Sequence, residues 1–217
     1  AFGRKDIYSE ETAASALREW RIKGGRLSDE EFDIIQIRNG EEILVGRLNS
    51  ILAHNFSFRH RTVNAFIVLS DGRTILQRRA HHKRSEPLRM SIYGGHVKAR
   101  LSYSEAMEEE LKEELELPEG QELKGDLLLV RQEGEFRWDG KCNREVRSLY
   151  VYFATTEEVK TILEYGKYLE EQKLKMTEKQ FKSWLEDENK NNPGHAEVWG
   201  LYLEDISKLS GKVALRT

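Results

Sequence analysis

Residues 93–117 read YGGHVKARLSYSEAMEEELKEELEL and carry the strongest fold signal in the chain. A pair of glycines is followed by a short loop and then by a run that predicts a glutamate-rich helix. Glu110, Glu113 and Glu114 are spaced i, i+3 and i+4, so their carboxylates share one face of that helix. Like charges at this spacing repel unless a cation lies among them. The spacing suggests a helix whose acidic edge binds metal, whereas a charge run taken alone more often marks a solvated helix.

The metal that suits such an edge is Mg²⁺ or Mn²⁺. Mg²⁺ takes oxygen ligands, and proteins usually bind it through one or two carboxylates together with substrate phosphates. Met107, Leu111 and Leu115 run beside the acidic face and can anchor the helix to a core. We therefore expect a helix that is packed on one side and open to a metal ion on another.

The order of glycines and glutamates resembles the box of the Nudix superfamily, G-x5-E-x7-R-E-U-x-E-E-x-G-U, in which U is bulky and apolar. Counted from Gly95, the spacing holds throughout, and the three glutamates fall on the residues that bind metal in the family. Three positions depart from the pattern: Leu101, Glu109 and Glu116 stand where the family has Glu, Arg and Gly. The family's first Glu and its Arg largely brace the loop, so the resemblance leaves open how this loop is held.

Residues 54–83, HNFSFRHRTVNAFIVLSDGRTILQRRAHHK, are similar to the isopentenyl-diphosphate isomerase branch of that superfamily. The resemblance places His54 and His60 near two metal-binding histidines of the branch, one residue closer together than usual, and His96 on a third. It places Glu145 on a metal-binding and catalytic glutamate, whereas Asn143 replaces a second one. A loop histidine at position 54 and a packing histidine at position 60 are the structural alternatives.

The same resemblance assigns the phosphate-binding residues. Arg79 and Lys83 fall on the diphosphate-binding Arg and Lys of the branch, within a basic segment that is otherwise read as an ordinary loop. Gly94 and Gly95 are expected to border the substrate. The isomerases need a cysteine at position 94, so the resemblance points to a hydrolase, and isomerase activity would require catalysis without that cysteine.

Composition limits the class of protein. The chain has 217 residues, of which 38% are hydrophobic and 34% charged, with a net charge of −3. This balance gives no general attraction to nucleic acid or membrane, and no apolar run approaches the length of a membrane span. A single cysteine, Cys142, excludes an internal disulfide and fits a reducing compartment. The start of the sequence lacks the apolar core of a signal peptide, so the expected location is the cytoplasm.

Local patterns predict the rest of the chain. Residues 9–23 predict a helix capped by Ser9, and Asn39-Gly40 predicts a hairpin between two strands. Further strands are expected at 62–69, 74–78, 126–132 and 145–153, whereas 51–59 is ambiguous. Residues 157–194 predict a helical insertion, and 196–209 resemble the closing strand and helix of a Nudix domain.

These observations predict an α/β fold, a Nudix-type α/β/α sandwich around a mixed sheet. Residues 1–27 form an N-terminal helical extension, 28–217 form the Nudix domain, and 157–194 are a helical insertion before the last strand. The function that the resemblance implies is Mg²⁺- or Mn²⁺-dependent cleavage of a diphosphate bond in a nucleoside-diphosphate-linked or related organic diphosphate. Glu113 or Glu145 would take the proton of the attacking water. The alternative is a Nudix-fold binding or regulatory module without turnover, and either could be a homodimer.

Overall fold

The structure is a computed structural model that describes residues 7–69, 74–78, 90–115, 117, 120, 122–137, 144–165, 172–176 and 183. The chain divides into two compact units. The first unit comprises 1–64, 94–110 and 131–149, and the second comprises 65–93, 111–130 and 150–217. One helix, Tyr103–Leu115, and several strands begin in one unit and end in the other.

The first unit begins with helix α1, Glu10–Ile22, which confirms the helix predicted over 9–23. Ser9 is its N-cap, and the Thr12 amide donates to the Ser9 hydroxyl at 3.1 Å. The Thr12 hydroxyl in turn accepts from the Ser9 amide at 2.8 Å, which completes a capping box. The helix therefore begins where the local sequence satisfies its free amides.

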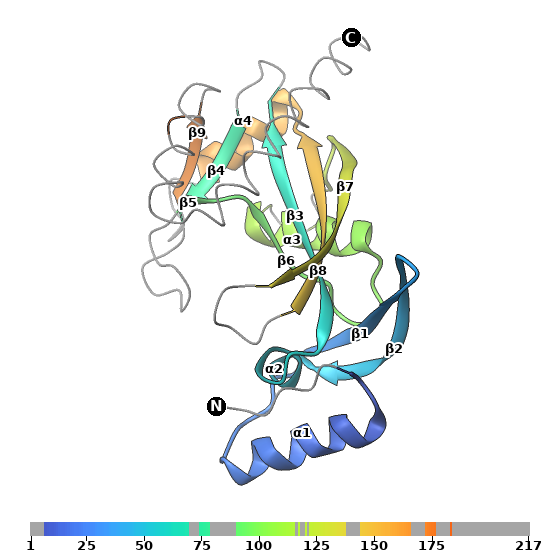
Figure 1. Cartoon of the computed structure of the whole chain (residues 1–217). Coiled ribbons are helices and arrows are strands. Elements are labelled where there is room, and N and C mark those ends of the chain that lie inside the picture. The colour runs from blue at the N-terminus through green and yellow to red at the C-terminus, as the bar shows by residue number, and fades with distance from the viewer. Residues whose placement is uncertain are drawn as a thin grey trace. The chain divides into compact units, whose positions relative to one another are not determined.

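Strands β1, Glu31–Arg38, and β2, Glu41–Asn49, pair antiparallel and form the predicted hairpin, coloured blue in Figure 1. The turn residues Asn39 and Gly40 have φ values of 54° and 83°. Positive φ at both central residues matches the twist of the strands, and Asn-Gly is the residue pair that adopts this conformation at low cost. The hairpin prediction is confirmed.

Helix α2, Ser50–Asn55, follows the hairpin and contacts both of its strands. Apolar side chains from α1, α2, the hairpin and the residues after α2 form the core of this unit. The buried members are Ala16, Phe32, Ile34, Leu48, Leu52, Ala53, Phe56 and Phe58. This core fixes α2 against the hairpin, which matters because α2 carries His54.

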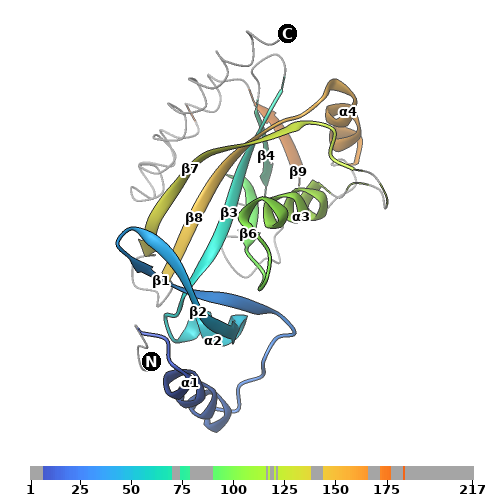
Figure 2. The ribbon, with the colours of Figure 1, turned by 90° about the vertical axis from the view of Figure 1, so that its right-hand side faces the viewer.

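In the described part of the chain, seven strands form a sheet in the order β5-β4-β3-β8-β7, while β6 pairs with β3 and β9 with β4. Their bounds are β3 Arg59–Val68, β4 Thr74–Arg78, β5 Met90–Ser91, β6 Tyr93–His96, β7 Asp126–Arg137, β8 Arg144–Phe153 and β9 Gln172–Met176. Figure 2 shows β3, β8 and β7 running side by side. The strands predicted at 62–69, 74–78, 126–132 and 145–153 are therefore confirmed.

Helix α3, Tyr103–Leu115, is the predicted glutamate-rich helix. Its apolar side is buried as expected, because Met107, Leu111 and Leu115 are each at most 1% exposed. Burying this stripe anchors the helix while its acidic residues keep access to solvent or to a ligand. The secondary structure, with a mixed sheet and few helices, confirms the α/β class.

The second unit ends, among the described residues, with helix α4, Thr156–Tyr165, and strand β9. Glu158 is buried and fixes the start of α4. Its carboxylate accepts hydrogen bonds from the Lys124 amide at 2.6 Å, from the Thr155 amide and hydroxyl at 2.8 Å each, and from the Tyr152 hydroxyl. The pKa of the Glu158 carboxyl lies below its usual range, because these donors outweigh the burial that raises it.

The helical prediction for residues 157–194 is correct at α4 and wrong at β9. Gln172–Met176 reads QKLKM, in which residues 173–176 alternate between polar and apolar with the period of a strand. The segment pairs antiparallel with β4, which supplies its backbone with hydrogen-bond partners. The basic residues Arg79 and Lys83, Cys142, Asn143 and the expected closing segment 196–209 lie outside the described residues. Among the helices that are described, none is long and apolar enough to cross a bilayer.

Candidate functional site

Three histidines from three different elements converge in the first unit. His54 lies on α2, His60 on β3 and His96 at the end of β6. Each ring offers one nitrogen, and these three nitrogens all lie within 4.8 Å of one another. The ring of His54 is 4.7 Å from each of the other two, measured between centroids. We call these three residues the histidine cluster.

The protonation of His60 leaves one nitrogen available to a metal. His60 is fully buried, and its Nδ1 lies 2.9 Å from the carbonyl oxygen of Phe58. A carbonyl only accepts, so Nδ1 carries the proton and Nε2 carries a lone pair. Burial, reinforced by the two other histidines, lowers the pKa of His60 to about 3, so the ring is neutral near pH 7.

The His60 Nε2 atom is also a buried polar atom without a hydrogen-bond partner among the described residues. Buried polar nitrogens are normally satisfied, and an exception calls for an explanation such as an absent ion. A histidine that donates through one nitrogen to a backbone carbonyl while the other faces two further imidazoles is the usual arrangement of a metal ligand. The histidine cluster therefore fits a divalent metal ion.

Glu145 adds a carboxylate beside the cluster. It is 5% exposed, and its Oε1 lies 3.5 Å from His96 Nε2, while its Oε2 lies 3.6 Å from an Arg147 guanidinium nitrogen. Burial raises the pKa of the Glu145 carboxyl, but the His96 contact and the surrounding positive charge outweigh it and lower the pKa to about 2. Glu145 is thus an anion near neutral pH and can serve as an oxygen ligand next to the imidazoles.

The phenyl ring of Phe32 lies against all three histidines. It stacks on His60 at 5.0 Å and 21° and on His96 at 5.1 Å and 17°, and it meets His54 edge-on at 5.5 Å. Phe32 is itself 1% exposed. The ring therefore orients the imidazoles and keeps water away from one side of the cluster.

The glycine pair is required by close packing on both sides. Gly94 has a φ of 145°, and a Cβ at this position would lie 2.2 Å from the carbonyl oxygen of Val63. A Cβ at Gly95 would lie 2.3 Å from Oε1 of Glu110. The first glycine lets β6 approach β3, and the second makes room for a carboxylate of the predicted metal edge.

The other two glutamates of that edge, Glu113 and Glu114, lie one turn further along α3. Glu113 is exposed and Glu114 is half-buried. Gln77, which is 1% exposed on β4, donates from its amide nitrogen to Oε1 of Glu114 at 3.1 Å and to the carbonyl oxygen of Ile92 at 3.3 Å. Such a donor orients a carboxylate before any ligand binds.

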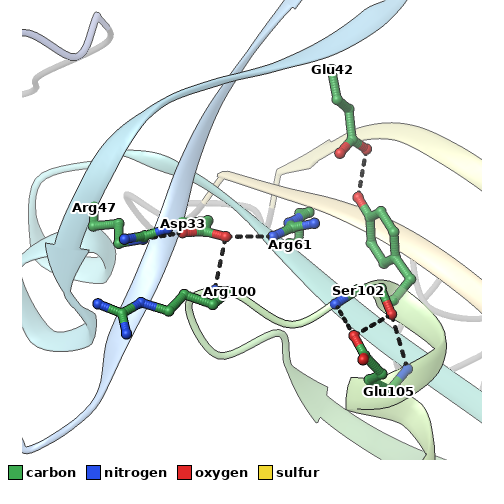
Figure 3. Close-up of polar contacts among 8 residues, drawn as sticks. Asp33, Glu42, Arg47, Arg61, Arg100, Ser102 and Glu105 are labelled. Carbon is green, nitrogen blue, oxygen red and sulfur yellow. Dashed lines mark hydrogen bonds and ion pairs between the residues drawn. The ribbon is translucent and has the colours of Figure 1, made fainter.

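The sequence indicated the three histidines, Glu145 and the helix glutamates, but it did not indicate Phe32, Asp33 or Gln77. Asp33 is 4% exposed and interacts with two arginines and a loop amide (Figure 3). An aspartate within the apolar run FDII was the available signal, because a charged residue in a buried strand needs partners. Phe32 and Gln77 have ordinary places in their strands, and nothing local distinguishes them.

Comparisons with known proteins identify the family of this chain. A family model described as the NUDIX domain matches residues 58–196. The chain is 32% identical over 90 residues to an uncharacterized Nudix hydrolase of Nostoc sp., which is 41% of this chain and 53% of that protein. The chain thus spans about half the length of the curated relative it matches.

Two solved structures are also similar. The protein DR0079 of Deinococcus radiodurans is 25% identical with a TM-score of 0.43, and the match covers 58% of this chain and 72% of that one. A mutT/nudix family protein of Listeria innocua is 16% identical with a TM-score of 0.44, over 72% of this chain and 97% of that one. Because the family model spans more than half of the residues, from 58 to 196, the chain belongs to the NUDIX domain family.

Proposed function

We propose that this chain is a metal-dependent hydrolase that cleaves a diphosphate bond in a nucleoside-diphosphate-linked or related organic diphosphate. The observation that carries the proposal is the histidine cluster, whose nitrogens lie within 4.8 Å of one another beside the ionised Glu145, in a chain that also has the family's metal-binding glutamates. The three histidines are also the residues that the resemblance to the isomerase-like branch assigns to metal binding.

The two sets of ligands suit different ions. Glu110, Glu113 and Glu114 offer only oxygen, which suits Mg²⁺ or Mn²⁺. The histidine cluster offers nitrogen, which suits Mn²⁺ or another transition metal better than Mg²⁺. When bound, such ions neutralise phosphate charge and lower the pKa of a coordinated water. We therefore expect the chain to bind more Mn²⁺ than Mg²⁺ per molecule.

The two candidate bases differ in their chemistry. A pKa of about 2 makes Glu145 a weak proton acceptor near neutral pH and favours a role in binding cations. Glu113 is exposed on α3, where a water molecule can reach its carboxylate, so we assign it the proton of the attacking water. Arg79 and Lys83 lie outside the described residues, and we propose that they orient the diphosphate.

The test is a hydrolysis assay with Mg²⁺ and with Mn²⁺ that detects phosphate-ester products as well as inorganic phosphate. The panel contains nucleotide sugars, dinucleoside polyphosphates, nucleotide cofactors and prenyl diphosphates. We expect turnover of one class, its loss in Glu113→Gln with an unchanged melting temperature, and weaker Mn²⁺ binding in His60→Gln. Turnover that survives Glu113→Gln would contradict the assignment of the base.

A second function, ligand binding without turnover, is favoured by one observation. Leu101 and Glu109 replace the residues that brace the loop in the family. A chain that binds Mn²⁺ and a diphosphate but cleaves no member of the panel would support this function and exclude the hydrolase. Exchange of an allylic proton in deuterated water, with no phosphate release, would instead support the isomerase.

A further inference from the structure

The loop of residues 97–102 joins the histidine cluster to the glutamate helix, and it lacks the family's brace. His96 precedes this loop and α3 follows it. The family's bracing positions hold Leu101, which is apolar, and Glu109, which forms an ion pair with Lys98 at 3.4 Å. Both partners of that pair are exposed by more than a third, so it contributes little. Another part of the chain must hold the loop.

Asp33 on β1 contacts the loop directly. Its Oδ2 accepts a hydrogen bond from the backbone amide of Arg100 at 3.0 Å. Arg100 has a φ of 75°, a conformation that a residue other than glycine keeps only when its surroundings enforce it. The bond from a buried carboxylate to this amide supplies that enforcement.

The charge of Asp33 is balanced by two arginines, as Figure 3 shows. Arg61 Nη2 lies 2.8 Å from the same Oδ2 that binds the loop, and Arg47 Nε lies 2.9 Å from Oδ1. Arg61 is 15% exposed and Arg47 41% exposed, so Arg61 is the inner partner and Arg47 the outer one. The two oxygens thus make different contacts: Oδ2 accepts the hydrogen bond from the loop, and Oδ1 pairs with an arginine near solvent.

The residues next to Asp33 make further contacts with the same loop. The amide of Ala99 donates to the carbonyl oxygen of Glu31 at 2.8 Å, and Phe32 forms an isolated antiparallel bridge with Lys98. The side chain of Phe32 is the ring that stacks on the histidine cluster. Residues 31–33 therefore touch the loop through their backbone and through Asp33, and they touch the cluster through Phe32.

We infer that Asp33 is a positioning residue. It takes the place of the family's missing brace and holds the loop in a fixed position relative to the histidine cluster. The inference rests on the proposed function, because it assumes that the cluster binds metal. The family match begins at residue 58, so the positioning element comes from a hairpin outside the matched domain. Residues 31–33 then form part of the site, because they support both the loop and the histidine cluster.

The test compares Asp33→Asn with Arg47→Gln in the full chain. Asparagine replaces one carboxylate oxygen with an NH2 group, which cannot accept a hydrogen bond. If this group faces the Arg100 amide, the bond to the loop is lost, and if it faces a guanidinium, the ion pair is lost. Glutamine at position 47 removes one ion pair of Asp33 and leaves Oδ2 with both of its partners. Mn²⁺ binding is followed by electron paramagnetic resonance, and folding by circular dichroism and thermal melts.

We expect Mn²⁺ affinity to fall at least tenfold in Asp33→Asn and to stay within twofold of wild type in Arg47→Gln, with both variants folded and both melting earlier. Equal losses of affinity in the two variants would mean that Asp33 acts only through stability. Wild-type affinity in Asp33→Asn, with an Arg100 amide that exchanges in this variant as fast as an unprotected amide, would overturn the inference.

Amide hydrogen exchange at Arg100 provides a second measurement that needs no metal. In the wild-type chain and in Arg47→Gln, we expect this amide to exchange at least tenfold more slowly than an unprotected amide. Rapid exchange in the wild type would overturn the inference even if Asp33→Asn does not fold. A wild-type chain that protects Arg100 but binds no Mn²⁺ would refute the proposed function and leave the contact between β1 and the loop in place.

Discussion

Gly94 and Gly95 are adjacent, yet alanine should weaken metal binding at Gly95 and destabilise the fold at Gly94. At Gly95 the new Cβ would lie 2.3 Å from Glu110 Oε1 and 2.6 Å from Oε2. These atoms end a flexible side chain, so the carboxylate can move away. At Gly94 the new Cβ would lie 2.2 Å from the carbonyl oxygen of Val63 in strand β3, which cannot move without distorting the sheet.

The size of the effect of Gly95→Ala follows from the distance that the Glu110 carboxylate must move. The Glu110 carboxylate must retreat from 2.3 Å to the 3.4 Å at which ordinary contact begins. A displacement of about 1 Å can reduce turnover by roughly a hundredfold. Misplacing one of several ligands should weaken Mn²⁺ binding about tenfold, or about 1.4 kcal/mol. The free energy of unfolding should stay within about 1 kcal/mol of wild type, because alanine also restricts the unfolded chain.

Gly94→Ala should instead lower the free energy of unfolding. A φ of 145° is strained for alanine, which costs about 1–3 kcal/mol, and the contact with Val63 adds to that strain. We expect Gly94→Ala to lower the free energy of unfolding by at least about 3 kcal/mol. Any Mn²⁺ binding that remains in the folded fraction should resemble that of the wild type.

Urea unfolding and Mn²⁺ titration by electron paramagnetic resonance measure both effects. Glu110→Gln is the matched control, because it weakens the ligand without displacing it. Near wild-type Mn²⁺ affinity in Gly95→Ala, with a clear loss in Glu110→Gln, would refute the argument that the glycine positions the carboxylate. Equal stability of Gly94→Ala and wild type would refute the packing argument at β6.

Three further predictions concern buried polar groups. Metal-free protein should lose about 2 kcal/mol of stability between pH 8 and pH 5, because unfolded His60 takes up a proton near pH 6.5 whereas folded His60 does so only near pH 3. Urea melts of His60→Gln should lack most of this dependence of stability on pH. Gln77→Met removes the amide that donates to Glu114, so Mn²⁺ affinity should fall about tenfold, and an unchanged titration would contradict this role. Glu158→Gln should lower the free energy of unfolding by about 2 kcal/mol without changing Mn²⁺ affinity, whereas a changed affinity would show that α4 influences the site.

Local sequence predicted the elements whose ends depend on neighbouring residues. Ser9 caps α1, and Asn39-Gly40 turns the hairpin, through contacts and torsions that lie within a few residues. The glutamate spacing on α3 is likewise a property of one helix. Strand β9 was mistaken for helix because its conformation depends on pairing with β4, which lies about a hundred residues away in the sequence.

Sequence alone therefore determined the α/β class, the glutamate helix and the identity of the histidines. The spacing of residues in a helix or strand is local, and the histidines were identified through the resemblance. Only the tertiary structure decided that the three histidines meet, that Phe32 lies against them and that Asp33 holds the loop. The bond between Asp33 and Arg100 joins residues 67 positions apart, and the one between Gln77 and Glu114 joins residues 37 apart. Contacts of this kind depend on how the strands and the helix pack together, and no periodicity or motif in the sequence records them.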